Sequence, residues 1–527
     1  MPWMRLLPRK SFFMEENIVK TTFTRTLALL LALLMAFAAF AMVSCADDTT
    51  PEEGDDQPGT TTPDDEKVPE DDEEPRIPLD YLPTTRYDGT EIHILEWSAN
   101  GQEEVGRGWI PWEEIDVDEG DGDPINNAIY DRNGVVEETY GVTVTKEYLS
   151  VDGSPAFHTA FRSNESSGDQ AYQMITMRTV GIAGLAMESL MANMFEMPNL
   201  HTDMPWWNQD SVRSYTMGSA LFFAAPEMLL RDKGATAAMY FNQKIASDEG
   251  IDDLYETAVN GEWTMDLMIE YAENVTADLD GDDVVSSAED MFGLNGGGRD
   301  IPYFLYTASG NKFAVIDDDG YLELTFGDEE DITIWQDILD YVMYSDFFGA
   351  NIADASLIPE GYKPFQSDKC LFEMNLVKDV LGLRNMESDY GVLPVPKYDE
   401  SQEDYSSLVW MHHDCVLGIP GSCTNTDIIS TVLEHMSYIS YYDVYPIFYD
   451  TIILGKSARD QQSKEMLELI FRTRSFDPGQ YWLAESTGPF LTLFELNKTN
   501  ISSVWAGAIK QVETELENFN EKIDELS

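Results

Sequence analysis

The pattern of apolar and polar positions predicts short strands separated by helices from about residue 79 to the C-terminus. Residues 91–95 (EIHIL) and 172–176 (YQMIT) have the apolar content of strands. Asp123 precedes Pro124, which is the usual N-cap chemistry of a helix, and Gly141 is placed to end that helix before a strand at 142–144. This strand–helix–strand order predicts a mixed α/β sheet.

The last segment of the chain carries one apolar stripe. Its members are Ile509, Val512, Leu516, Phe519, Ile523 and Leu526. Steps of three and four place them on one face, so we expect a closing helix that packs on the body of the protein. About 450 residues is large for one α/β core, and two lobes are the natural arrangement.

The N-terminus reads as an export signal followed by a spacer. Lys20 and Arg25 precede an uncharged run at 26–43, and small residues lead to Cys45. The junction resembles a bacterial lipobox, in which cleavage precedes the cysteine and that cysteine is lipidated, so 1–44 is expected to be a signal peptide. An uncleaved membrane span is the alternative, since eighteen residues just reach across a bilayer. Met14 is an alternative start.

Residues 45–78 follow as an acidic, Pro- and Thr-rich stretch. Almost no apolar residue is present in it, so it cannot bury a core, and we expect a disordered tether after the lipidated Cys45. These features predict a location on the extracellular face of the cytoplasmic membrane, with attachment through the lipid alone.

Charge excludes several classes of partner. The 527 residues include 32 Lys and Arg against 97 Asp and Glu, a net charge of −65. Such a charge repels phosphate backbones, so no nucleic-acid partner is expected.

Four Cys are too few for a disulfide scaffold, and six His leave little for a His-based metal site. Cys415 and Cys423 could pair outside the cell.

One acidic segment has the ligand spacing of a calcium loop. Oxygen ligands fall at positions 1, 3, 5, 7, 9 and 12 of residues 278–289. These are Asp278, Asp280, Asp282, Val284 through its backbone, Ser286 and Glu289. Asp283 stands at position 6, where the EF-hand pattern has Gly. A structural Ca²⁺ is therefore predicted, and an ordinary acidic turn is the alternative. No other cofactor is expected.

Several phrases together resemble the family 1 extracellular solute-binding proteins of ABC transporters, in their Gram-positive lipoprotein subgroup. They are AMYFNQK at 238–244, GEWTMD at 261–266, DYGVLPVPK at 389–397, VLGIP at 416–420, and the segments 123–144 and 205–207. They keep the family's order from about Ile92 to Arg472. The resemblance implies a two-lobed α/β fold of the periplasmic-binding-protein type II class, with hinge crossovers around a ligand cleft.

By analogy with that family, the N-terminal lobe would comprise 79–225 and 368–422, and the C-terminal lobe 226–367 and 423–527. The resemblance implies a monomer that captures a small solute by hinge closure, with an oligosaccharide as the expected ligand, and delivers it to permease subunits. A sugar-binding site needs aromatic rings that stack on the sugar and polar side chains that form hydrogen bonds with its hydroxyl groups. The expected cleft residues are Glu96, Trp97, Trp206, Trp207, Glu227, Arg231, Asn375, Lys378, Tyr481 and Trp482. Adjacent Trp residues in a strand or tight loop point opposite ways, so at most one of Trp206 and Trp207 is expected to face ligand, and both could be core.

A surface glycoside hydrolase or a carbohydrate-binding adhesin is the alternative. A hydrolase needs two carboxylates about 5 to 9.5 Å apart across a cleft, and so many acids leave such a pair open. The sequence contains no G-x-S-x-G, H-E-x-x-H or P-loop motif, so no catalytic residue is assigned and a non-enzymatic function is expected.

Overall fold

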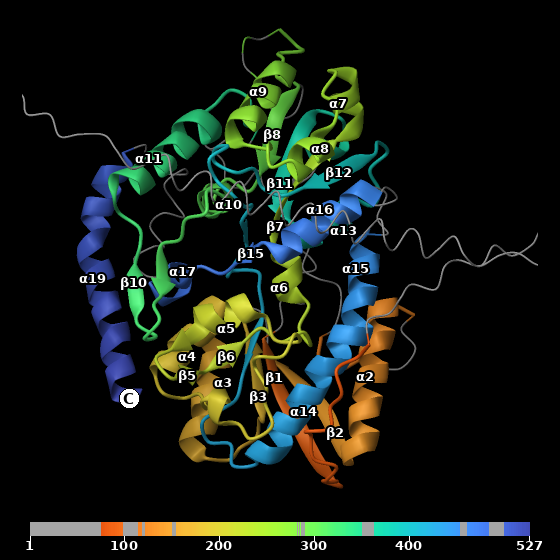
Figure 1. Cartoon of the computed structure of the whole chain (residues 1–527), viewed down its shortest axis with the longest axis vertical. Coiled ribbons are helices and arrows are strands. Elements are labelled where there is room, and N and C mark those ends of the chain that lie inside the picture. The colour runs from red at the N-terminus through yellow and green to blue at the C-terminus, as the bar shows by residue number, and fades with distance from the viewer. Residues whose placement is uncertain are drawn as a thin grey trace, which may run out of the picture. The chain divides into compact units, whose positions relative to one another are not determined.

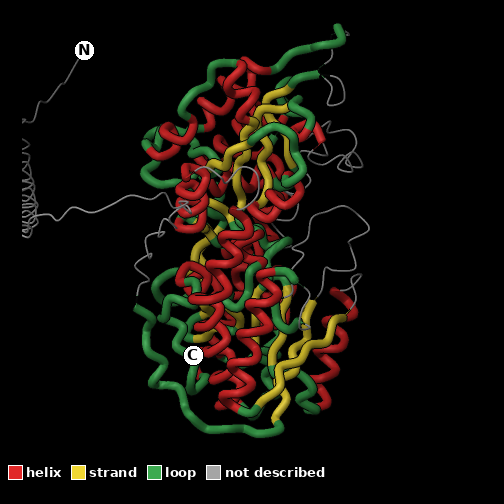
Figure 2. Tube along the Cα trace, turned by 90° about the vertical axis from the view of Figure 1, so that its right-hand side faces the viewer, coloured by secondary structure: helices red, strands yellow, loops and turns green. Residues whose placement is uncertain are grey.

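The computed structural model describes residues 75–97, 114–117, 122–149, 154–281, 283, 285, 290–349, 363–453, 461–483 and 500–526. Arg76–Ser527 form one compact unit. Its two larger sheets, of five and four strands, each have their own layer of helices (Figure 1). We call each sheet with its helices a half, and Figure 2 shows the strands of the two halves one above the other. No helix in the described part of the chain is both long and apolar enough to cross a membrane.

The first half is built on the sheet β2-β1-β3-β14-β6. Its strands are β1 (Thr90–Trp97), β2 (Val142–Leu149), β3 (Met174–Met177), β6 (Phe223–Ala224) and β14 (Val416–Gly418). β1 runs parallel to β2 and β3, and β14 is antiparallel to β3 and β6. The surrounding elements are α2 (Pro124–Tyr140), α3 (Ser154–Ser167), α4 (Thr179–Met187), η2 (Met194–Glu196), α5 (Gln209–Tyr215), β4 (Thr216–Met217), β5 (Ala220–Leu221) and α14 (Thr426–Ile439).

The second half is built on the sheet β12-β7-β11-β8. Its strands are β7 (Ala237–Asn242), β8 (Phe292–Gly296), β11 (Cys370–Leu376) and β12 (Tyr390–Leu393). β7 is antiparallel to β11 and β12, and β11 is parallel to β8. The surrounding helices are α7 (Gln243–Asp248), α8 (Leu254–Val259), α9 (Met265–Val275), α10 (Ile301–Ala308), α11 (Glu329–Asp337), η3 (Ile338–Met343), α12 (Lys363–Gln366), η5 (Val377–Asp379), α13 (Val380–Leu383) and α16 (Gln461–Arg472).

The remaining elements lie between the halves or contact both. They are α6 (Arg231–Gly234), β9 (Ala314–Ile316), β10 (Leu322–Leu324), β13 (Ser407–Leu408), η6 (Ser440–Val444), α15 (Tyr445–Ile453), β15 (Arg474–Ser475), α17 (Pro478–Trp482) and α19 (Ile501–Leu526). α14, η6 and α15 follow one another without a break and lead from the first half toward the second (Figure 1). α19 places Ile501 in the second half's core and Val512, Phe519 and Ile523 in the first half's core.

The predicted elements near the N-terminus are confirmed. The Asp123 side chain caps α2 by accepting hydrogen bonds from the backbone N–H groups of Ile125 and Asn126. Gly141 ends the helix with φ 71°, a left-handed conformation that Gly adopts without strain. The closing segment, which carries the apolar stripe, also forms a helix, α19. Its buried residues include Val512, Phe519 and Ile523.

The lobe boundaries need correction. β11 and β12 pair with β7, and Phe372 and Met374 of β11 pack in the core of the second half. Residues 370–393 therefore belong to the second half, although the predicted N-terminal lobe included 368–422. Conversely, α14 buries Ile429 and Leu433 in the first half's core, although 423–527 was assigned to the other lobe.

Candidate functional site: the crossover region and its charged residues

Three chain segments run side by side between the two sheets. The backbone N–H of Trp410 donates to the carbonyl of Ala235 at 2.9 Å, and Val409 N–H donates to the carbonyl of Ser475 at 2.9 Å. The first segment leads from β6 through α6 to β7, the second from β13 to β14, and the third contains β15. These three segments form the hinge region of the molecule, because each of them passes from one half to the other.

α6 carries the predicted cleft residue Arg231 and also Lys233, which pairs with the predicted residue Glu227. The Arg231 guanidinium lies 3.0 Å from a carboxylate oxygen of Glu96 and 2.9 Å from one of Glu114, and all three side chains are buried. It also donates to the carbonyl of Trp97 at 3.2 Å. Removing one partner of such a buried group of charges would leave the others uncompensated, so this contact fixes the end of β1 to the hinge.

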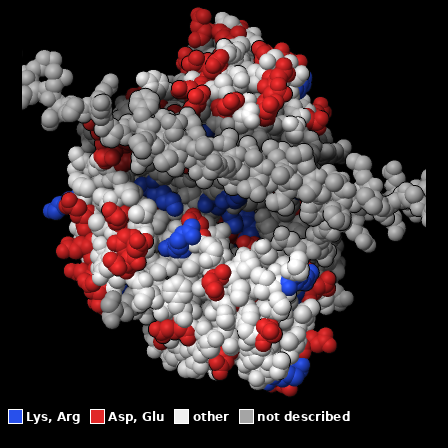
Figure 3. All heavy atoms as spheres, viewed as in Figure 1, with Lys and Arg blue, Asp and Glu red and all other residues white. Residues whose placement is uncertain are grey.

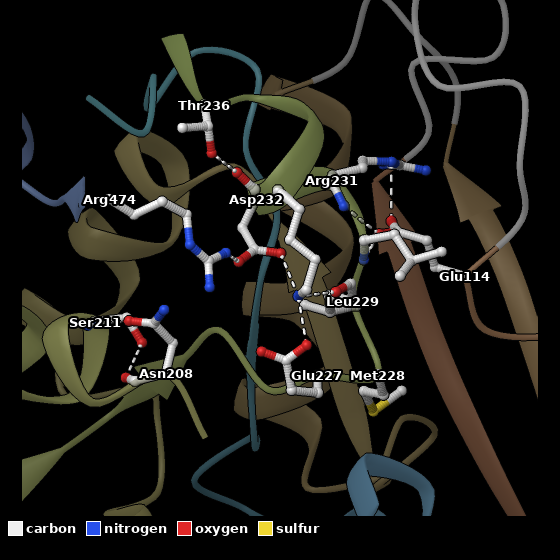
Figure 4. Close-up of polar contacts among 12 residues, drawn as sticks. Glu114, Asn208, Ser211, Glu227, Met228, Leu229, Arg231, Asp232, Thr236 and Arg474 are labelled. Atoms are coloured by element: carbon white, nitrogen blue, oxygen red, sulfur yellow. Dashed lines mark hydrogen bonds and ion pairs between the residues drawn. The ribbon is translucent and has the colours of Figure 1, made fainter. Parts of the chain in front are cut away.

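The next two residues of α6 continue the charged network (Figure 4). Lys233 lies 3.0 Å from the carboxylate of Glu227 and 3.2 Å from that of Asp232, and it donates to the carbonyl of Leu229 at 2.8 Å. Asp232 also accepts a hydrogen bond from Arg474 of β15 at 2.8 Å. The predicted residue Glu227 therefore belongs to a buried network that joins two hinge segments through Lys233, Asp232 and Arg474.

Trp97 ends β1 and lies beneath a cation. The Arg178 guanidinium sits over its ring, 4.4 Å from the centroid, which is a cation–π contact. Arg178 also donates to the carbonyl of His412, in the second hinge segment. Trp97 is buried in the first half's core, so a sugar stacked on it would have to use the rim of the ring or displace the guanidinium.

Asp414 is buried behind this contact and has an altered acidity. Its carboxylate accepts hydrogen bonds from the backbone N–H and the hydroxyl of Thr179, at the start of α4. Burial raises the pKa of Asp414 to about 7, and burial lowers the pKa of the neighbouring His412 to about 4. His412 is therefore neutral at neutral pH, whereas Asp414 is close to half protonated.

Asn375 and Lys378 lie where β11 of the second half meets the hinge. The Asn375 amide donates to the carboxylate of Glu373 at 3.3 Å, and Lys378 lies 3.0 Å from the carboxylate of Asp379. The backbone N–H of Val377 donates to the carbonyl of Thr236 at 2.8 Å, which attaches this turn to the first hinge segment. Burial raises the pKa of Glu373 to about 8.

The tryptophan pair has a packing role. The indole N–H groups of Trp206 and Trp207 donate to the two carboxylate oxygens of Glu434 on α14, at 2.9 and 3.0 Å, and both rings are buried. Of the two alternatives that the sequence left open for the pair, packing in the core is the one that the burial of both rings supports. Both belong to the interior of the first half.

Tyr481 and Trp482 of α17 are also buried in the first half's core. The Tyr481 hydroxyl donates to the carbonyl of Ser214 at 2.7 Å, and the Trp482 ring lies 5.6 Å from that of Phe223 on β6. They lie near the hinge at the end of the sheet, but they do not contact Trp97 or Arg231 in any described interaction.

A group of basic side chains was not found from the sequence. Arg213 on α5 lies 2.8 Å from the carboxylate of Asp210, and Lys312, which precedes β9, lies 4.0 Å from the same carboxylate. Figure 3 shows Lys and Arg atoms gathered in a hollow near the middle of this face, while Asp and Glu dominate the surface above it. That hollow is at the height of α6 and β15 in Figure 1.

The predicted calcium loop is described in part. The carboxylates of Asp278, Asp280 and Asp290 offer oxygen atoms that all lie within 4.8 Å of one another. Asp283, at position 6, has φ 66°, the backbone conformation that the pattern's Gly supplies. Three carboxylates suit a hard cation. Asp282, Val284, Ser286 and Glu289 lie outside the described residues, and Asp290 was not among the predicted ligands.

Cys370, Cys415 and Cys423 are unpaired thiols, so the possible Cys415–Cys423 disulfide is absent from the described residues. Cys45 and the signal and tether segments lie outside them.

No protein-family model matches the chain, and no curated protein matches its sequence. Solved structures do match its fold. The ABC substrate-binding protein Lmo0181 from Listeria monocytogenes, in complex with cycloalternan, is 10% identical, with a TM-score of 0.50, over 83% of this chain and 100% of its own. M. tuberculosis UspC is 12% identical with a TM-score of 0.52, over 81% and 100%. A cyclo/maltodextrin-binding protein complexed with maltotetraose is 12% identical with a TM-score of 0.54, over 81% and 97%.

The chain therefore has the two-lobed α/β fold of the ABC-transporter substrate-binding proteins of the carbohydrate type. The resemblance that the sequence phrases indicate is confirmed at the level of the fold.

Proposed function

We propose that this protein is a membrane-tethered, extracellular solute-binding lipoprotein. It captures an oligosaccharide between its two halves and delivers it to the permease of an ABC importer. The observation that carries the proposal is the shared fold, which covers 97 to 100% of two proteins whose structures hold cycloalternan and maltotetraose. The function is binding and delivery, not catalysis.

The hinge region supports capture by closure. The three segments of the hinge region cross between the halves side by side, joined to one another by backbone hydrogen bonds such as those of Val409 and Trp410. Small rotations in such segments move two rigid halves relative to one another. A solute that contacts both halves binds the closed state better and shifts the population toward it.

A thermal-unfolding screen of the whole chain in detergent tests the proposal, with Trp fluorescence as the signal. The panel contains cycloalternan, maltotetraose and plant-derived oligosaccharides. A bound solute stabilises by RT ln(1 + [L]/Kd), which is about 2.7 kcal/mol at a hundredfold excess over Kd. We expect a higher melting temperature with at least one sugar, recovery of that sugar intact, and a smaller radius of gyration in X-ray scattering.

Two variants sharpen the test. Trp97→Leu changes the end of β1 at the hinge and should weaken sugar binding at least tenfold. Trp505→Leu is the matched control, because Trp505 lies on α19 against Phe326, with ring centroids 4.7 Å apart. Sugar recovered in cleaved form would favour the glycoside hydrolase alternative, and no stabilisation by any sugar would contradict an oligosaccharide ligand.

A further inference from the structure

We propose that the β9–β10 hairpin (residues 314–324) and the C-terminal part of α19 (residues 512–525) form a clasp that holds the two halves together on one side of the hinge region. The clasp concerns how the halves move and not what binds between them, so it goes beyond the proposed function. Its basis is the place of the hairpin. The chain enters it from α10 and leaves it toward α11, both in the second half, but the hairpin itself packs on the first half.

The hairpin is part of the core of the first half. Ala314 and Leu322 are 0% and 2% exposed, and both pack in that core. Phe313 and Phe326, which lie just outside the two ends of the hairpin, pack instead in the core of the second half. The chain therefore crosses from one half to the other at each end of the hairpin. Because protein cores are close-packed, the hairpin must move with the first half.

The C-terminal part of α19 holds the hairpin in place. The Asn520 side chain accepts a hydrogen bond from the backbone N–H of Leu322 at 3.0 Å and donates one to its carbonyl at 3.2 Å. The Tyr321 hydroxyl donates to the carboxylate of Asp524 at 2.7 Å. Ile523 of the same helix is buried in the core of the first half. The hairpin and this part of α19 thus form one unit on the first half.

The tip of the hairpin meets the first half backbone to backbone. The N–H of Gly218, in the turn between β4 and β5, donates to the carbonyl of Gly320 at 3.0 Å. A Cβ atom on Gly320 would lie 2.4 Å from the Cα of Gly218, so a larger residue would have to push the two turns apart. Gly320 also has φ 85°, a conformation that Gly adopts without strain. This close contact fixes the tip on the first half.

Three connections between the halves lie side by side across Figure 1. The clasp is at the left edge, where α19 and β10 lie, the hinge region with α6 and β15 is near the middle, and α15 is on the right. Two bodies joined at several places along one line can rotate about that line, but they cannot twist against one another or separate at either end. The clasp therefore leaves the halves one closing motion and prevents them from separating on the side of α19.

Pulsed electron paramagnetic resonance on the whole chain in detergent measures this motion. Nitroxides on p-acetylphenylalanine replace either Phe195 and Tyr341, or Val135 and Val259, all of which are exposed. The first pair lies on η2, which contacts β5, and on η3, which continues α11, so it spans the side of the clasp. The second pair lies on α2 and α8 and spans the other side (Figure 1).

Gly320→Ala should push the tip of the hairpin off Gly218. We expect the distance distribution of the pair on the clasp side to become at least twofold wider, and that of the other pair to stay unchanged. Gly89→Ala is the matched control, because Gly89 has φ 83° and a Cβ atom there would meet nothing within 4 Å. It carries the same backbone strain without the clash, so both distributions should stay as in the parent protein.

Asn520→Ala is a second variant, which removes two hydrogen bonds to the hairpin and leaves the glycine turns unaltered. It should widen the same distribution. Equal widths on the clasp side in the parent protein and both variants would overturn the clasp. Equal widening on both sides, or widening in Gly89→Ala, would also overturn it, because the effect would then be a general loosening. The measurement contains no solute, so these results would leave the proposed function standing.

Discussion

Glu434 is a buried carboxylate on α14 that holds together three separate segments of the first half. It accepts hydrogen bonds from the indoles of Trp206 and Trp207, from the hydroxyl of Tyr81 at 2.8 Å, and from the backbone N–H of His201 at 3.2 Å. Four donors around one acceptor compensate for its burial. The two tryptophans are thus structural residues.

Glu434→Gln should destabilise the protein by about 3 kcal/mol. A glutamine amide keeps one oxygen acceptor but turns an NH₂ group toward donors, so part of the network is left unpaired. Urea unfolding followed by Trp fluorescence measures the change. Glu513→Gln, on the exposed face of α19, is the control and should shift the free energy of unfolding by less than about 0.5 kcal/mol.

Asp414 and Glu373 make stability depend on pH. Burial raises their pKa values to about 7 and about 8, above the values that the unfolded chain would have. The folded state therefore binds protons that the unfolded state has released, and this contribution is lost as pH rises through the folded pKa values. His412 and His435, whose pKa values burial lowers to about 4, act in the opposite direction and mainly below pH 6.5.

Between pH 7 and pH 8 the carboxyl groups should dominate. We expect the free energy of unfolding to fall by about 1 kcal/mol over this interval. The variant Asp414→Asn/Glu373→Gln should show a much smaller change, whatever its absolute stability. Urea unfolding at both pH values measures the slopes, and equal slopes in the variant and the parent protein would refute the assignment to these two residues.

At the scale of elements, the sequence predicts where helices begin and end better than it predicts which strands pair. The Asp123 cap, the Gly141 end of α2 and the stripe of α19 depend on residues close in sequence, so they are readable from it. The partner strand of β11 cannot be read from the sequence, because the apolar residues Phe372 and Met374 of β11 would fit either sheet. Arg213 and Lys312 were missed for the same reason, since only the fold brings both of them to Asp210.

Binding of Ca²⁺ by the loop at 278–290 remains a prediction. We expect 1 mM Ca²⁺ to raise the melting temperature by about 2 °C and EDTA to reverse the rise. Asp278→Asn should abolish the response, because it removes a charged ligand from the group of three. Asp318→Asn, in a different exposed acidic loop, should keep it, and a full response in Asp278→Asn would leave the segment an acidic turn.

At the scale of the whole molecule, the tether prediction concerns residues outside the described part of the chain. Cys45→Ser should release the protein into the medium or leave its signal uncleaved, because the acceptor for the lipid is gone. Labelling with radioactive palmitate and the apparent mass of the secreted chain measure this. Cys423→Ser should keep the label, and lipid on the Cys45→Ser protein would show that the lipobox interpretation is wrong.

The segments that contact both halves also determine whether the two halves unfold together or separately. α19 has side chains in both cores, and the backbone N–H of Gly218 in the first half donates to the carbonyl of Gly320, in the turn between β9 and β10, at 3.0 Å. Neither half retains its complete core when the other unfolds. The halves should therefore melt in one calorimetric transition, and a gene cut between β6 and β7 should yield two insoluble fragments.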